Sequence, residues 1–168
     1  MFQVSALPSE RFRHLYGMSE EALAAAGVIV RVADAKPGYP CRVSLRDAEP
    51  GARMLLLNFE HQDAATPYRS AHAIFVRDGA EDTALAPGEV PELLRARLLS
   101  VRAFSQAGMI VDGEVTEGAG AASVFARLLD NPQAAYLHVH FAKFGCYAAR
   151  VDRVTEHVSH SAVAASSR

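Results

Sequence analysis

Hydrophobic and polar residues alternate along much of the chain, which predicts β-strands more often than helices. The stretches with the pattern and length of a strand lie at residues 2–6, 28–33, 41–46, 53–59, 71–77, 99–104 and 109–115. Turn-forming residues separate them, most clearly between Asp47 and Gly51. The chain is therefore expected to contain several strands.

A few short helices are predicted between the strands. The strongest helical period lies in residues 121–129, where five apolar side chains share one face: Ala121, Val124, Phe125, Leu128 and Leu129. Shorter segments with helix-start signals lie at residues 9–16, 19–26 and 90–98, and Ser19 is a good N-cap. This uneven order predicts an α+β fold, with a largely antiparallel sheet and a few short helices packed against it.

Residues 136–150 have the pattern of a β-hairpin and hold the densest group of reactive side chains. Strand alternation places two sets on opposite faces of the first strand: Leu137, Val139 and Phe141 on one, and Tyr136, His138 and His140 on the other. The loop length then decides which residues of the second strand lie beside the histidines.

Two loop lengths fit this hairpin. A three-residue loop at residues 143–145 pairs His138 with Arg150, and a two-residue loop shifts the pairing by one. The side chains placed on the histidine face are then Cys146, Ala148 and Arg150 with the longer loop, or Tyr147 and Ala149 with the shorter. We favour the longer loop, because Gly145 then stands where a left-handed backbone is needed.

Composition excludes some classes of function. The chain has 168 residues and a formal net charge of −2, so it lacks the basic excess of a nucleic-acid-binding protein. No apolar run approaches the roughly 20 residues that cross a bilayer, and the first residues do not resemble a signal peptide. We expect a cytoplasmic protein with one α+β domain at residues 1–156 and a flexible tail at residues 157–168. Cys41 and Cys146 are then expected to be free thiols.

His138 and His140 are the first candidates for chemistry. Two imidazoles at i and i+2 on a strand share a face and can bind one metal ion, for which zinc needs at least a third ligand. The candidates for that ligand are Cys146, His61, His72 and Cys41. The spacing fits no zinc signature, so hydrogen-bonded histidines without a metal are the favoured alternative. Cys146 is also a candidate nucleophile activated by a histidine, against the alternative of an inert thiol.

Four arginines in or beside predicted strands suggest an anion site: Arg42, Arg69, Arg102 and Arg150. Together with His61, Tyr68 and His72 they form a candidate ligand-binding set. Three hypotheses follow. The favoured one is a domain that binds a small anionic metabolite. The alternatives are a metal-dependent or Cys/His hydrolytic enzyme, in which His138, His140 and Cys146 are catalytic, and a non-catalytic homodimer.

Four stretches together resemble a bacterial family catalogued as domain of unknown function 1203. They are residues 40–51 (PCRVSLRDAEPG), 55–62 (LLLNFEHQ), 67–70 (PYRS) and 138–150 (HVHFAKFGCYAAR). The resemblance covers about residues 20 to 154. It implies a bacterial protein with a single domain and carries no activity, cofactor or catalytic residue.

Overall fold

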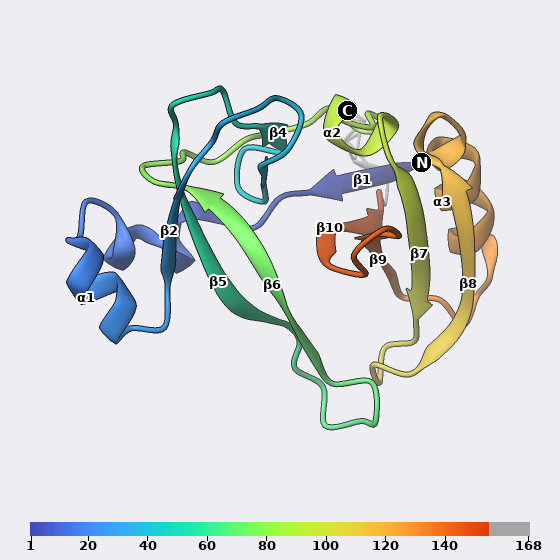
Figure 1. Ribbon diagram of the computed structural model, residues 1–168. Coiled ribbons are helices and arrows are strands. Elements are labelled where there is room, and N and C mark those ends of the chain that lie inside the picture. Colours follow the sequence, from blue (N-terminus) through green and yellow to red (C-terminus); the bar gives the residue numbers. More distant parts are fainter. Residues whose placement is uncertain (155–168) are drawn as a thin grey trace, which may run out of the picture.

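The computed structural model describes residues 1–154 and has the predicted α+β architecture. Ten strands form two five-stranded sheets, accompanied by a few short helices (Figure 1). The strands are mostly antiparallel, as the sequence predicts. The predicted tail at residues 157–168 and the domain end at residue 156 lie outside the described residues.

The first sheet contains the hairpin at the C-terminal end of the described chain. Its strand order is β1–β10–β9–β7–β8, and every neighbouring pair is antiparallel. The strands are β1 (Phe2–Ser5), β7 (Leu98–Phe104), β8 (Ile110–Glu117), β9 (Tyr136–Phe141) and β10 (Tyr147–Arg153). Strand β9 lies at the centre, and all six of its residues are buried.

The second sheet is built around a long hairpin of β5 and β6, and its strand order is β2–β5–β6–β3–β4. The strands are β2 (Ile29–Val32), β3 (Pro40–Cys41), β4 (Arg46–Asp47), β5 (Arg53–Gln62) and β6 (Ser70–Arg77). Strand β3 pairs with β6 in parallel, which is the exception in this sheet. The β5–β6 hairpin stands beside the first sheet (Figure 1).

Helix α3 (Ala121–Asp130) covers one face of the first sheet. The five side chains predicted to share its apolar face are all buried, and they pack in one cluster with Leu137 and Val139 of β9. The opposite face of β9, which carries His138 and His140, is thereby turned toward the second sheet. The predicted alternation of β9 is confirmed, and it decides where the histidines lie.

The other helices are short. Helix α1 (Glu20–Ala25) begins after Ser19, whose side chain accepts a hydrogen bond from the backbone N–H of Ala22 at 3.2 Å, as its predicted capping role requires. Helix α2 (Glu92–Arg95) has a single turn, and 3₁₀ turns lie at Ser9–Arg11, Arg13–Leu15 and Gly118–Gly120. In the part of the chain described, no helix has the length and apolar character needed to cross a membrane.

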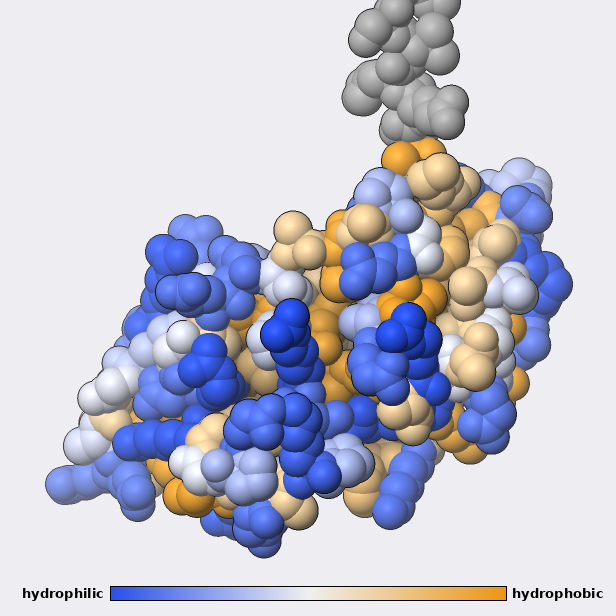
Figure 2. Space-filling view, turned by 90° about the horizontal axis from the view of Figure 1, so that it is seen from above, coloured by the Kyte–Doolittle hydropathy of each residue, from blue (hydrophilic) through white to orange (hydrophobic). Residues whose placement is uncertain are grey.

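Two predicted elements differ in the structure. Residues 9–16 form two 3₁₀ turns rather than one helix. The predicted strand at residues 41–46 is a tight turn between β3 and β4, because Leu45 has a left-handed backbone with φ 50°. The alternating pattern there reflects burial of Val43 and Leu45 inside that turn. Seen from above, hydrophilic side chains cover most of the surface, and hydrophobic surface is exposed in a hollow between them (Figure 2).

Candidate functional site

Four histidines meet between the two sheets: His61 from β5, His72 from β6, and His138 and His140 from β9. A bulge in β5 brings the first of them into place. Glu60 pairs with Ala71 and Gln62 with Ser70, so His61 is an extra residue in its strand. Such a bulge redirects side chains. As a result both His61 and the following Gln62 reach the first sheet, where Gln62 Nε2 donates to the hydroxyl of Tyr136 at 2.7 Å.

A second bulge, in β10, sets the composition of the histidine face. Arg150 lies opposite His138, as the three-residue loop predicts, but Tyr147 lies opposite His140 because Ala148 is an extra residue. The predicted placement of Cys146 and Ala148 on the histidine face is therefore wrong. Gly145 does adopt the predicted left-handed backbone, with φ 71°.

The ring nitrogens form a connected set. His61 Nε2 lies 2.7 Å from His72 Nδ1, and His61 Nδ1 lies 3.3 Å from His138 Nδ1. His140 Nδ1 lies 2.9 Å from the carbonyl oxygen of Gly145. Because a carbonyl only accepts, the proton of His140 belongs on Nδ1, and Nε2 then carries a lone pair.

That lone pair has no partner. His140 is 0 % exposed, and its Nε2 is a buried side-chain atom without a hydrogen bond among the described residues. A buried polar atom left unpaired costs about 1–3 kcal/mol. Native structures keep few such atoms, and a missing ion is one explanation for them.

One nitrogen from each of His61, His138 and His140 lies within 4.8 Å of the other two. Zinc–nitrogen bonds of about 2.0–2.1 Å place two nitrogens of a tetrahedral site about 3.4 Å apart. The 3.3 Å between His61 Nδ1 and His138 Nδ1 matches that spacing. If Nε2–H of His61 donates to His72, its Nδ1 is free to bind the ion, and His72 orients the ligand from behind.

Burial keeps these histidines neutral. Desolvation, the largest cause in each case, lowers the pKa of His61 to about 4, of His138 to about 3 and of His140 to about 2. It also lowers the pKa of His72. The positive charge of Arg102 lowers the pKa of all four further. Neutral imidazole is the form that binds metals.

Tyr147 and Arg102 complete the immediate surroundings. The Tyr147 ring is stacked on His61, with centroids 4.7 Å apart and planes 13° apart, and it meets His138 edge-on at 5.1 Å. Arg102 lies opposite His138 on β7. Its backbone is paired in the sheet, but its guanidinium makes no hydrogen bond or ion pair with any of residues 1–154, and desolvation lowers its pKa. A half-buried cation without a carboxylate partner thus stands beside the histidines.

The remaining predicted site residues are divided between three places. Arg42 and Cys146 contact each other on the far side of Tyr147, with Arg42 Nη2 donating to Cys146 Sγ at 3.2 Å. Arg69 forms an exposed ion pair with Glu60 at 2.9 Å, and Tyr68 is exposed in the loop beside it. The predicted set is therefore not one cluster.

Arg150 remains at the histidine face. It pairs with Asp152 at 2.8 Å and stacks on the ring of Tyr136 at 3.9 Å. The two cysteines are free: Cys41 is buried, and Cys146 is half-buried.

Comparison with known families identifies the family of the chain. The family model described as protein of unknown function (DUF1203) matches residues 38–153. The chain belongs to the DUF1203 family. No curated protein and no solved structure matches it. The matched range contains all four histidines of the site, so the cluster lies within the DUF1203 domain.

Tyr136, Tyr147 and Gln62 belong to this site but are not among the predicted site residues. Tyr136 is predicted to share the histidine face, although no role at the site is predicted for it. Tyr147 is on the histidine face in the two-residue-loop alternative, whereas Arg150 is there in the three-residue alternative. The bulge in β10 combines both registers. Strand alternation carries no signal for an extra residue, so neither bulge could be predicted from the pattern.

Proposed function

We propose that the protein is a metal-dependent enzyme in which His61, His138 and His140 hold one divalent transition-metal ion. The observation that carries the proposal is the buried, unpartnered Nε2 of His140. A set of histidines that served only packing would satisfy its nitrogens by hydrogen bonds within the protein. Here the backbone of Gly145 holds the opposite nitrogen of the ring and leaves Nε2 without a partner.

The donor set suggests the class of metal and of reaction. Three imidazoles suit zinc, iron, copper and nickel, and they exclude magnesium and calcium as preferred ions. Three protein ligands leave a coordination position for water or substrate, which is the pattern of catalytic rather than structural zinc sites. A metal in that setting lowers the pKa of bound water to about 7 and supplies a nucleophile at neutral pH. Hydrolysis is therefore the proposed reaction type.

Arg102 supports a reaction at an anionic centre. Its charge disfavours a bare cation beside it, but an anion bound between the metal and Arg102 is attracted by both. Charge that develops on an oxygen during hydrolysis is stabilised in the same way. We assign Arg102 the role of binding the anionic group of the substrate or the transition state.

Metal content tests the proposal. Protein purified without a histidine tag is dialysed against zinc, freed of excess, and analysed for metal beside His61→Ala and His61→Ala/His140→Ala. His14→Ala is the matched control, because His14 is exposed and outside the cluster. We expect about one equivalent in the wild type and the control, and none in the double variant.

Cobalt gives a second, independent readout. Substitution by Co²⁺ should produce the intense visible absorption of a four-coordinate site, and this absorption should be absent in His61→Ala. Circular dichroism establishes that each variant is folded. Wild-type protein that takes up neither zinc nor cobalt would overturn the proposal, and so would equal uptake by the double variant.

A further inference from the structure

A cleft of about 690 Å³ opens between the two sheets, next to the histidine cluster but distinct from it. Its walls are largely apolar and come from both sheets and the β9–β10 loop: Leu56, Phe75, Leu98, Phe141 and Phe144. His72 is the residue that the cleft shares with the cluster. Pockets of this size with apolar walls and a few polar groups are typical of small-molecule sites.

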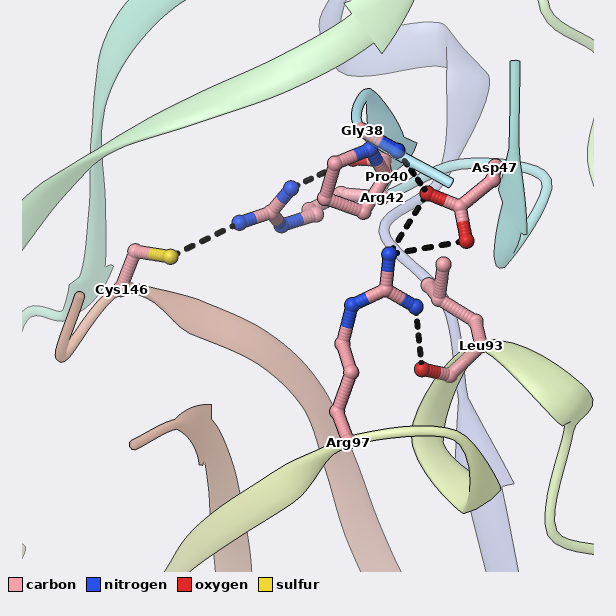
Figure 3. Close-up of polar contacts among 7 residues, drawn as sticks. All are labelled: Gly38, Pro40, Arg42, Asp47, Leu93, Arg97 and Cys146. Carbon is pink, nitrogen blue, oxygen red and sulfur yellow. Dashed lines mark hydrogen bonds and ion pairs between the residues drawn. The ribbon is translucent and has the colours of Figure 1, made fainter. Parts of the chain in front are cut away.

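The charged side chains that line the cleft are all positive. Arg42, Arg97 and Lys143 line it, and no lining residue, all of which lie within residues 1–154, is Asp or Glu. Arg97 is neutralised from outside the cleft, since its Nη2 lies 2.6 and 2.8 Å from the two carboxylate oxygens of Asp47 (Figure 3). Arg42 has no carboxylate partner among residues 1–154, and its side-chain hydrogen bonds are with Tyr147, Pro40 and Cys146.

Arg42 is a buried cation held by neutral groups. It is 1 % exposed, and its guanidinium donates to the carbonyl of Tyr147. It also donates to the carbonyl of Pro40 and to the thiol of Cys146 (Figure 3). Those contacts use three of its five N–H groups. Burial lowers its pKa to about 10, so it stays charged at neutral pH. The ring of Phe141, 4.9 Å away, offsets only part of the cost of a buried charge.

We propose that this cleft binds an organic anion, with a carboxylate at Arg42 and a flat apolar body between the aromatic walls. The Arg42 guanidinium has only neutral hydrogen-bond partners, so it supplies a charge that a carboxylate can match through the two remaining N–H groups. The rim supports an aromatic ligand, because Phe144 is 77 % exposed beside the opening and belongs to none of the buried hydrophobic clusters of residues 1–154. This site requires no metal, so it stands apart from the proposed metal centre.

Alkylation of Cys146 tests the proposal, since this thiol lies in the cleft against Arg42, while Cys41 is 1 % exposed. Rates are measured with neutral iodoacetamide and with anionic iodoacetate, in EDTA, on the native and the urea-unfolded chain. We expect the ratio of the iodoacetate rate to the iodoacetamide rate to be at least about fivefold higher in the native protein than in the unfolded chain. The reason is that the charge of Arg42, beside Cys146, attracts the anionic reagent. Cys146→Ser should abolish the reaction of the native protein, in which Cys41 is buried.

Protection then identifies the ligand class. We expect 1-naphthoate to slow iodoacetamide alkylation in a saturable manner, and neutral 1-naphthamide to do so at least tenfold less effectively. Arg42→Gln should remove the preference for the anion. Because Arg42 is buried and this variant can misfold, Phe144→Ala serves as a second variant and should weaken protection without affecting the core. Arg69→Gln, an exposed arginine elsewhere, is the matched control.

Three results would overturn the proposal. One is a rate ratio equal in the native and unfolded chains, and another is equal protection by the acid and the amide. The third is a thiol that reacts with neither reagent, because the cleft is then closed to ligands. Since all measurements are made in EDTA, failure of the metal proposal leaves them unaffected.

Discussion

Replacing His140 by leucine should change the stability of the protein in opposite directions with and without metal. Leucine has a similar volume and no polar side-chain atom, so it removes the buried Nε2 that lacks a partner. That removal is favourable by about 1–3 kcal/mol. The substitution also removes the 2.9 Å hydrogen bond to the carbonyl of Gly145, which is worth about 0.5–1.5 kcal/mol. Without metal, we expect the stability of His140→Leu to lie between about 0.5 kcal/mol below and about 2.5 kcal/mol above that of the wild type.

Zinc should reverse that order. A ligand at 100 times its dissociation constant stabilises the folded state by about 2.7 kcal/mol. For a chain of this length, that corresponds to a rise in Tm of roughly 5–11 °C. His140→Leu loses one of three ligands and should gain little. Urea unfolding in EDTA and thermal unfolding with and without zinc measure both halves of the prediction.

The His14→Leu variant controls for stray zinc binding, because it alters an exposed histidine far from the cluster in sequence. It should show the full zinc shift. If His140→Leu is less stable than the wild type by more than about 1 kcal/mol in EDTA, the lone pair of Nε2 is not a source of instability. If its zinc shift equals that of the wild type, His140 is not a ligand.

Three further outcomes are expected. In the folded protein the pKa of His138 is about 3 and that of His140 is about 2, whereas both are about 6.5 in the unfolded chain. Below pH 6.5 the unfolded chain therefore binds more protons than the folded protein. The free energy of unfolding in EDTA should therefore fall by about 2 kcal/mol for each histidine as the pH falls from 7 to 5. Urea titrations that show no such loss would contradict the burial of neutral imidazole rings. Gly118→Ala should lower the free energy of unfolding by about 1–3 kcal/mol, since a Cβ would lie 2.0 Å from the carbonyl oxygen of Leu94. An unchanged Tm in thermal circular dichroism would contradict that close approach. His72→Ala should weaken metal binding about 10- to 100-fold, because it removes the hydrogen bond that orients His61. Competition with a coloured chelator measures this affinity, and an unchanged value would mean that His72 does not orient the ligand.

The parts of the fold that the sequence predicts well are those with a regular period. The apolar face of α3 and the alternation of β9 follow from helical and strand geometry, and both are confirmed. The prediction of a strand at residues 41–46 is wrong for the turn at residues 42–45, because burial of Val43 and Leu45 imitates alternation. The local pattern of apolar residues does not distinguish a strand from a buried turn, such as the one in which Leu45 has a positive φ.

The candidate site was predictable in composition but not in assembly. His61 and His72 were recognised as possible third ligands for the pair on β9, and the structure brings both beside it. Arg42 and Cys146 also meet, but at the cleft rather than at the histidines. Which of these partners approach each other depends on contacts between segments about 80 to 100 residues apart. A single sequence contains no direct signal for such contacts.

The two strand bulges have a consequence for related chains. Each adds one residue to an otherwise regular ladder, at His61 in β5 and at Ala148 in β10. Removing His61 would restore uninterrupted pairing of β5 with β6 but would delete a proposed metal ligand. Removing Ala148 would leave Tyr147 opposite His140 and Arg150 opposite His138, so the histidine face would keep its composition. A member of the DUF1203 family that is shorter by one residue in β5 is therefore expected to keep the architecture and lack the metal centre, whereas one shorter by one residue in β10 is expected to keep both.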